Sequence, residues 1–477
     1  MYPETAVRFS CNDPAIQKLF DTACEKCKGN LSFFGPHRVL VEGGGYEKIW
    51  LETQPMGGEM YAKHNLTAAL NNQLLFMENQ RADGRLPGSI QGFADGHVEA
   101  QFNKFQGFCF PWPALNMYYW IGEDQDYLRR LYACLKAFDE YLWRVRDSDG
   151  DGVLESWCVY DTGEDNALRY GDSPVYWTED TPPRGYATVP MASMDVTAYS
   201  YAARDTLAEI SGILRDGQVR KWRAAADAVA SSLKARLWDD ARSACFDRGN
   251  DGKIIDVLCH NSLRCMYFGV FSQRMADRFI QEHLLNPKEF WTVLPLPSVS
   301  VSDPLFRNAP ENNWSGQCEG LTYQRAILAL ERYGYNKIVT ALGKKLMRAV
   351  IEGGYVFAQQ YDPFTGAPSL VSAVTKKPLQ PGSSDPCQDA YGPTLLSVLE
   401  YMAHIWGITM VRGSMWFSLG EGLDYTWEQQ WGENSFRIAS DGRKAHIFIN
   451  DTEAACSACG VRLTLSRNGR IMGKTEI

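Results

Sequence analysis

The segment from residue 147 to residue 170 carries the densest set of side chains that could do chemistry. Its second half places Glu164 and Asp165 beside Asn166 and Arg169. A carboxylic acid near an amide and a guanidinium can donate a proton while its neighbours hold the substrate. Cleavage of a glycosidic bond needs such a donor at the leaving oxygen and a second carboxylate across the sugar ring. A loop of acids is more often structural, so the local sequence leaves both interpretations open.

The first half of the same segment is similar to the start of a calcium-binding loop. Asp147, Asp149 and Asp151 alternate as oxygen ligands do in an EF-hand. Cys158 stands where that loop needs its bidentate glutamate, and Glu155 is the alternative carboxylate. We expect either a structural Ca²⁺ bound by the three aspartates and Glu155, or a solvated acidic turn. No other cofactor is expected.

Composition favours a neutral, hydroxyl-rich ligand. Of the 477 residues 12% are aromatic, with 14 Trp, 23 Tyr and 22 Phe, and many stand beside acids or amides. Aromatic faces stack on the CH groups of sugars while polar neighbours meet the hydroxyls, although core packing explains aromatic residues equally well. The formal net charge of −9 and the lack of a basic stripe argue against a nucleic-acid partner.

The 13 cysteines form no convincing metal or redox motif. Cys24 and Cys27 make one CxxC pair and Cys456 and Cys459 another, more than 400 residues away, and no histidine pair with ligand spacing accompanies either. We expect free, mostly buried thiols.

The chain is expected to be cytoplasmic, with no membrane partner. The first ten residues, MYPETAVRFS, lack the basic and apolar regions of a signal peptide. The most apolar stretch, 395–411, contains Glu400 and His404, so we expect a buried helix rather than a membrane span.

Helices are expected to position these residues from about residue 13 to residue 410. Apolar spacing and caps predict helices over Pro14–Lys28, Asn65–Glu78, Pro113–Ile121, Gln125–Val145, Met194–Ser211, Gln218–Trp238, Asp256–Gly269, Ser272–Leu285, Gly320–Tyr333, Asn336–Glu352 and Tyr391–Ile405. Alternating helices in two layers fit a double-layered toroid, with the loops at one end forming a pocket. The fold class predicted is mainly α, an (α/α)6 barrel over residues 1–410.

The pattern changes after about residue 411. Alternating apolar and polar residues predict strands over Ser435–Ala439, Lys444–Ile449 and Gly460–Leu465, with turns at Asp441-Gly442 and Asn468-Gly469. We expect residues 411–477 to form a small β-rich C-terminal region.

Several loops, taken in order, resemble those of the (α/α)6-barrel glycoside hydrolases of family 63 and its mannosylglycerate-hydrolase-like relatives, and more distantly the trehalases of family 37. The matching segments span about residues 40–410 and are IWLETQ (49–54), ESWCVYDTGEDNALRY (155–170), MASMDVTAYSYAA (191–203), LPLPSVSVSDPLF (294–306), NNWSGQCEGLTYQ (312–324) and QQYDPFTGAPS (359–369).

The resemblance implies roles for particular residues. Asp165 aligns with the general acid, and Glu52 with a sugar-binding acid. Contacts to the sugar are further implied for Asn166, Arg169, Gln360 and Tyr361, and stacking for Trp50, Trp112, Trp157 and Trp314. The resemblance also implies an inverting, exo-acting hydrolase that releases a terminal α-linked sugar from a short saccharide or glycoside.

One departure from the family concerns the general base. Gln359 stands where the family has a glutamate, and an amide cannot take a proton from water. Either another acid acts as base, with Glu319 as first candidate, or Gln359 replaces a native glutamate, or the protein binds sugar without hydrolysing it. Phosphorolytic and lyase enzymes on a related barrel are further alternatives. The sequence leaves the sugar, the linkage and the oligomeric state open.

Overall fold

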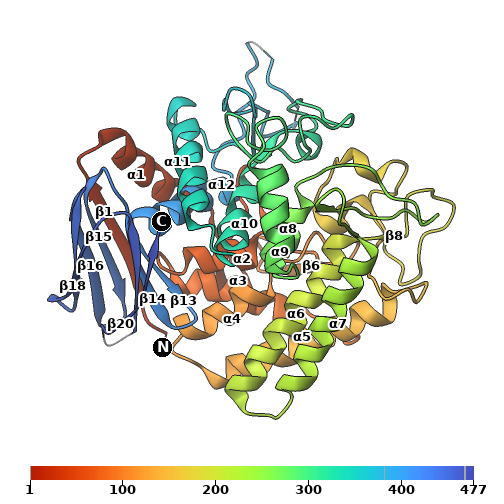
Figure 1. Ribbon diagram of the computed structural model, residues 1–477, viewed down its shortest axis with the longest axis horizontal. Coiled ribbons are helices and arrows are strands. Elements are labelled where there is room, and N and C mark those ends of the chain that lie inside the picture. Colours follow the sequence, from red (N-terminus) through yellow and green to blue (C-terminus); the bar gives the residue numbers. More distant parts are fainter. Residues whose placement is uncertain (1, 376, 381, 467–468) are drawn as a thin grey trace.

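The computed structural model describes residues 2–375, 377–380, 382–466 and 469–477. Its helices and strands follow the chain as shown in Figure 1. The helices are α1 Pro14–Gly29, α2 Gln54–Tyr61, α3 Leu66–Glu78, α4 Pro111–Trp120, α5 Gln125–Val145, α6 Met194–Leu214, α7 Val219–Arg236, α8 Asn261–Phe268, α9 Gln273–Phe279, α10 Gly320–Glu331, α11 Asn336–Glu352 and α12 Gly392–Trp406.

The even-numbered helices form a closed ring. Helix α2 contacts α4, and each even-numbered helix contacts the next until α12 contacts α2 again. Every residue of α2 and of α12 is buried, whereas α5 and α7 bury only one face. Helices buried all round lie inside a larger protein, and helices with one apolar stripe cover it. Helices α1, α3, α5, α7 and α11 contact the ring from outside.

The predicted helices are all present, but the sequence missed α2. Its sequence, QPMGGEMY, contains Gly57 and Gly58, which weaken an isolated helix. Both glycines are sites of close packing, because a Cβ on Gly57 would lie 2.7 Å from Leu396 and one on Gly58 2.8 Å from Asn72. The expected helix at 395–411 is also shorter than predicted, because Ile408–Val411 forms strand β13.

Short strands tie the loops between the helices together. They are β2 Leu31–Phe34, β3 His37–Leu40, β4 Lys48–Trp50, β5 Ser89–Gly92, β6 Val98–Gln101, β7 Glu155–Ser156, β8 Met191–Ala192, β9 Trp238–Asp239, β10 Ala244–Cys245, β11 Cys318–Glu319 and β12 Gln360–Tyr361. The antiparallel pair β11–β12 places Glu319 opposite Gln360.

The C-terminal region contains two antiparallel sheets, on the left in Figure 1. One has the order β13-β14-β19-β20 and the other β1-β15-β16-β17-β18. Their strands are β1 Thr5–Cys11, β13 Ile408–Val411, β14 Ser414–Leu419, β15 Asp424–Trp431, β16 Asn434–Asp441, β17 Lys444–Ile449, β18 Thr452–Ala458, β19 Val461–Leu465 and β20 Ile471–Glu476. The strands predicted from the sequence are all present. Of the predicted Asn468-Gly469 turn, Asn468 lies outside the described residues.

Strand β1 belongs to this region although it lies far from residues 411–477, where the sequence predicted the strands. It pairs along its whole length with β15, from Thr5 opposite Trp431 to Cys11 opposite Tyr425. Both ends of the chain therefore contribute to the strand-rich region, which packs against the helices through α12 and β14.

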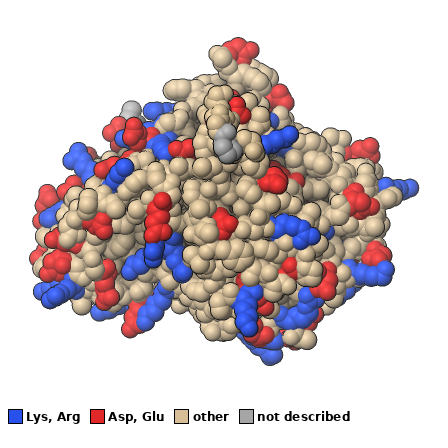
Figure 2. Space-filling view, turned by 90° about the horizontal axis from the view of Figure 1, so that it is seen from above, with Lys and Arg blue, Asp and Glu red and all other residues tan. Residues whose placement is uncertain are grey.

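On the face shown in Figure 2, acidic and basic side chains are interspersed. Among the described residues, no helix is both long and apolar enough to span a membrane.

Candidate active site

A compact cavity of about 100 Å³ lies among loops that are far apart in the sequence. The loops between α9 and α10 and between α11 and α12, which gather above α8 and α10 in Figure 1, contribute most of its wall. Amide and aromatic side chains predominate in the lining, which consists of Tyr46, Asp165, Asn166, Pro310, Glu311, Asn313, Trp314, Gln359, Gln360, Val371 and Gln388.

Asp165 is positioned and electrostatically tuned as a proton donor. Its side chain remains accessible from the cavity, while surrounding protein atoms remove the carboxyl from bulk water and raise its pKa to about 7. The negative charges of Glu52 and Glu164 raise the pKa further, and the nearby Lys104 opposes them. Gln106 Nε2 donates a hydrogen bond of 3.1 Å to Asp165 Oδ1. A carboxyl with this pKa can hold a proton at neutral pH and release it to a substrate.

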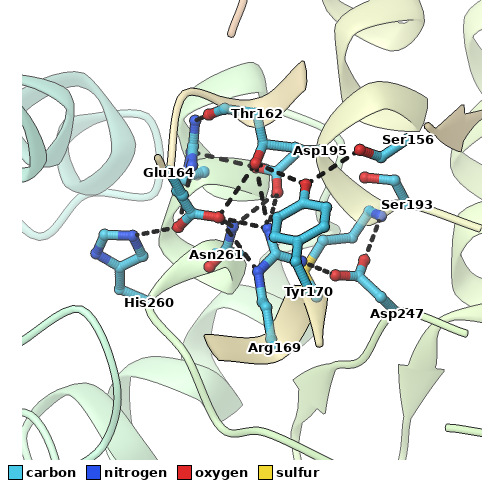
Figure 3. Close-up of polar contacts among 12 residues, drawn as sticks. Ser156, Thr162, Glu164, Arg169, Tyr170, Ser193, Asp195, Asp247, His260 and Asn261 are labelled. Carbon is cyan, nitrogen blue, oxygen red and sulfur yellow. Dashed lines mark hydrogen bonds and ion pairs between the residues drawn. The ribbon is translucent and has the colours of Figure 1, made fainter. Parts of the chain in front are cut away.

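A buried ion-pair network fixes the loop directly before Asp165. In Figure 3 the guanidinium of Arg169 points toward Glu164, Asp195 and Asp247. His260 Nε2 lies 3.0 Å from Glu164 Oε1, and Asn261 Nδ2 donates to the other oxygen of Glu164 at 3.1 Å. A buried carboxylate with this many partners has little freedom to move, so the chain segment that carries Asp165 is held rigidly.

The same network decides which of the buried acids is ionised. Burial opposes the charge on Glu164, but Arg169 and Arg264 lower its pKa well below the usual value. Glu52 is also buried, and both Arg264 and Arg325 pair with it. Burial nevertheless raises the pKa of Glu52 above its usual value. Neither Glu52 nor Arg169 is among the residues that line the cavity.

Gln359 lies on the cavity wall. Its Oε1 accepts hydrogen bonds from the Tyr46 hydroxyl at 3.1 Å and from Gln388 Nε2 at 3.4 Å. Gly43, Gly44 and Gly45 turn the chain just before Tyr46 with φ angles of 74°, 60° and 83°, a backbone that favours glycine. The three glycines therefore form the tight turn that precedes Tyr46.

Glu319 is the most unusual acid near the cavity. It is 0% exposed, and within the described part of the chain no hydrogen bond of ordinary geometry reaches its carboxylate oxygens, although the Asn313 side chain lies near enough to lower its pKa. Burial raises its pKa well above the usual value, and the charges of Glu52 and Asp165 add to this shift. A buried polar group without a partner is costly in free energy, and such groups gather where function requires them.

The four tryptophans singled out from the sequence lie in different surroundings. Trp314 lines the cavity, where the ring of His260 packs edge-on at 5.8 Å. Trp157 is 0% exposed and donates to Glu155. Trp50 lies beside Lys104 Nζ, 5.0 Å from the ring centre, and Trp112 lines a separate cavity.

Of the remaining residues predicted to contact the sugar, some lie on the cavity wall and others do not. Asn166 and Gln360 lie on the cavity wall. The hydroxyl of Tyr361, by contrast, points into the core and donates to the carbonyl oxygen of Val356 at 2.9 Å.

Three of the four predicted calcium ligands converge. Carboxylate oxygens of Asp147, Asp149 and Asp151 lie within 4.8 Å of one another. Glu155 is directed elsewhere, because it accepts hydrogen bonds from Ser148 Oγ at 2.7 Å and from Trp157 Nε1 at 2.6 Å. The oxygen set fits Ca²⁺ in chemistry but supplies three carboxylates rather than four, and calcium binding stays a prediction.

Sequence reasoning missed several residues of the cavity. Tyr46, Glu311, Asn313 and Gln388 line it together with the residues that were singled out. Glu311 and Asn313 belong to the loop ENNWSGQCEG, so their place in that loop was a usable signal. Gln388 comes from a segment without any motif, and only the fold brings it to Gln359.

Comparisons with known proteins agree with this architecture. Residues 60–379 match the family described as the mannosylglycerate hydrolase MGH1-like glycoside hydrolase domain. Among solved structures, the chain is similar to the GH63 mannosylglycerate hydrolase from Thermus thermophilus in complex with glucose, with 17% identity and a TM-score of 0.63 over 80% of this chain and 99% of that one. It is also similar to neutral trehalase Nth1 from Saccharomyces cerevisiae, with 12% identity and a TM-score of 0.58 over 80% of each chain.

A third structural likeness extends into the strand-rich region. A protein described as a sialidase matches with 12% identity and a TM-score of 0.70 over 96% of this chain and 41% of that one. At these identities the likenesses show the fold alone. The match to the family domain covers more than half of the chain, and the protein therefore belongs to the mannosylglycerate hydrolase MGH1-like glycoside hydrolases.

Proposed function

We propose that the protein is an exo-acting, inverting glycoside hydrolase that releases a terminal α-linked sugar from a short saccharide or glycoside. The observation that carries this proposal is the Asp165 carboxyl, which faces a compact cavity and has its pKa raised to about 7. A small cavity lined by amides and a tryptophan suits the end of a sugar chain better than its middle.

The proposal includes the scaffold. The closed ring of even-numbered helices and the helices outside it support an (α/α)6 barrel, in which loops from one end of the ring surround the substrate. The thirteen free cysteines, most of them buried, favour a reducing compartment, which we propose is the cytoplasm.

In the proposed reaction, Asp165 gives its proton to the glycosidic oxygen as the bond from that oxygen to the anomeric carbon breaks. A water molecule bonds to the anomeric carbon from the opposite face and loses a proton to a second carboxylate. Inversion requires roughly 6.5–9.5 Å between the two carboxyl groups, which leaves room for this water.

We assign the role of base to Glu319. The strand pair β11–β12 places Glu319 opposite Gln360, a residue of the cavity wall, so the carboxyl lies close to the cavity. Burial raises the pKa of Glu319 well above its usual value and so favours the protonated carboxyl. The assignment therefore requires that the bound sugar and its water hydrate this carboxyl and release the proton before turnover.

The second candidate function is sugar binding without hydrolysis. It is favoured by a specific observation: Gln359 is a neutral amide, and burial raises the pKa of Glu319 well above its usual value, which favours the protonated carboxyl. Asn166, Gln360 and Trp314 would then bind hydroxyls and stack on the ring, and no group would activate water.

One experiment separates these functions. The chain and its Gln359→Glu variant are incubated with a panel of α- and β-linked disaccharides and glycosyl-glycerates, and the anomer first released is identified by NMR. Turnover with inversion by the native sequence, abolished in Asp165→Asn and in Glu319→Gln, supports the proposal. Turnover by Gln359→Glu alone places the base position at residue 359 and makes the native chain a sugar-binding protein. Retention of configuration contradicts the inverting mechanism.

A further inference from the structure

The sheet β1-β15-β16-β17-β18 carries, on its solvent-facing surface, a group of three residues that the glycosidase chemistry does not use. His446 lies on β17, and Glu453 and Cys456 lie on the edge strand β18, at the far left of Figure 1. One ligand atom from each lies within 4.8 Å of the other two. We propose that this group is a binding site for a divalent transition-metal ion such as Zn²⁺, with Cys456 Sγ and His446 Nε2 as the direct ligands.

Strand pairing brings the two ligands together. His446 is directly opposite Cys456 in the antiparallel pair β17–β18. Side chains of directly opposed residues lie on the same face of a sheet and contact each other. The two residues are ten positions apart in the sequence, so no short metal-ligand motif predicts the pair.

A β-bulge adds the third residue. Glu453 and Cys456 are three positions apart, and in a regular strand their side chains would point to opposite faces. The register between β17 and β18 shifts between Ile447 and Phe448, so that Phe448 pairs with Glu453 while Ile447 pairs with Ala455. The additional residue turns Glu453 to the face of His446, and bulges are enriched where a side chain must be re-aimed.

The distances fit a metal ion between the sulfur and the nitrogen. Cys456 Sγ lies 3.7 Å from His446 Nε2. A tetrahedral Zn²⁺ with ordinary Zn–S and Zn–N bonds holds these two atoms about 3.6 Å apart. Thiolate and imidazole are ligands that Zn²⁺ prefers.

Glu453 completes the arrangement by contacting the His446 ring on the side away from the metal position. Its Oε1 lies 2.9 Å from His446 Nδ1. A carboxylate at Nδ1 holds the proton there and leaves the Nε2 lone pair directed at the metal, as in many zinc sites. His446, Glu453 and Cys456 are accessible to solvent, so the ion can enter, and water completes its coordination.

The neighbouring cysteine is not part of this site. Cys459 forms a CxxC pair with Cys456 in the sequence, but its buried Sγ lies 3.4 Å from Ser440 Oγ. The metal-binding pair is therefore formed across two strands rather than by the CxxC motif.

The test is a titration of the reduced, full-length chain with Co²⁺ as a spectroscopic probe. We expect a saturable thiolate-to-cobalt absorption at one equivalent, which Zn²⁺ removes by displacement. Cys456→Ser and His446→Ala should each lose the absorption, and Glu453→Gln should weaken Co²⁺ binding about tenfold. Binding should also weaken from pH 8 to pH 6, because the thiol and the imidazole bind the metal without their protons.

Cys24→Ser is the matched control, because it removes a thiol of the other CxxC motif and should leave the titration unchanged. An absorption that survives in Cys456→Ser, or a native chain that gives no thiolate-to-cobalt absorption, would overturn the proposal. A reactive thiol without metal affinity would show itself as alkylation of Cys456 that Zn²⁺ does not slow. Thermal midpoints measured without metal establish that each variant is folded.

Discussion

At the scale of single residues, the surroundings of Asp165 determine how activity should depend on pH. The general acid must be protonated, and the protein atoms that shield its carboxyl from bulk water raise its pKa to about 7. We therefore predict that kcat/KM falls about tenfold per pH unit above roughly pH 7. Asp165→Asn should lower kcat/KM at least about 100-fold and abolish this alkaline limb. A pH profile of both proteins with the best substrate of the panel checks this, and an unchanged alkaline limb in the variant would assign the pKa to another group.

The protonation of Asp165 also makes the stability of the fold depend on pH. The pKa of Asp165 is higher in the folded chain than its ordinary 3.8, so the folded state retains a proton that the unfolded state has lost. The stabilisation from this proton is fully present below about pH 4 and is lost as the pH rises through 7. Asp165→Asn carries no charge and should therefore have a higher melting temperature than the native chain at pH 8, with the difference shrinking toward pH 4.

Differential scanning fluorimetry across this pH range measures the effect. Glu311→Gln is the matched control, since Glu311 is an exposed carboxylate of the same cavity. It should change the melting temperature little. A melting temperature of Asp165→Asn below that of the native chain at pH 8 would show that burial does not penalise the ionised carboxyl.

At the scale of elements, the turn before Asp165 depends on a glycine that both its backbone conformation and its close packing require. Gly163 ends the 3₁₀ helix Val159–Thr162 with a φ of 76°. A Cβ at this position would lie 2.0 Å from Glu52 Oε2, and Glu52 is held by Arg264 and Arg325. We predict that Gly163→Ala destabilises the fold by about 2–4 kcal/mol, from backbone strain and displacement of this ion pair, and reduces activity.

Urea denaturation measures the change, with Gly185→Ala as the control. Gly185 has a φ of 86°, but a Cβ there would meet nothing within 4 Å. Gly185→Ala should lower the free energy of unfolding by only about 1 kcal/mol, from backbone strain alone. Equal losses in the two variants would show that the contact with Glu52 contributes nothing.

The elements themselves could be predicted where the signal is local. Helix α5 was predicted with its observed bounds, because Asp124 caps it and its apolar residues keep a helical spacing along 21 residues. Helix α2 and strand β1 could not be predicted in this way. The two glycines of α2 weaken the helix in isolation, and only close packing with other helices requires them. Strand β1 is stabilised by β15, which lies more than 400 residues away in the sequence.

In the candidate site, too, residues in local motifs could be predicted, whereas those that depend on tertiary contacts could not. Asp165, Trp314 and Gln359 were identified from short motifs, and the structure brings them to one cavity. Whether a given acid is ionised, exposed or committed to an arginine depends on tertiary neighbours, which is why Glu52 and Arg169 could not be distinguished in sequence from residues of the wall. Tyr46 and Gln388 belong to the site only through contacts between distant segments.

At the scale of the whole molecule, the strand-rich region is joined to the helical ring by a buried charge cluster. Arg462 of β19 pairs with Glu331 at the end of α10 at 2.7 Å and donates to the carbonyl oxygen of His404 on α12 at 3.1 Å. Glu331 also pairs with the His404 ring, which in turn contacts Glu400. Each of these side chains is less than 10% exposed, so removal of one charge leaves another without compensation in the interior.

We therefore predict that Arg462→Met destabilises the protein by about 3–5 kcal/mol, because Glu331 loses a partner in the interior. Glu331→Gln in the Arg462→Met background should recover part of the loss, since it removes the uncompensated charge. Lys474→Met, on the exposed neighbouring strand β20, is the control and should change stability by less than about 0.5 kcal/mol. Urea denaturation followed by tryptophan fluorescence measures these proteins together with the single variant Glu331→Gln, which completes the double-mutant cycle. Additive losses in the double variant would show that the two side chains stabilise the protein independently, and a single transition for helices and strands would show that the cluster makes the two regions unfold together.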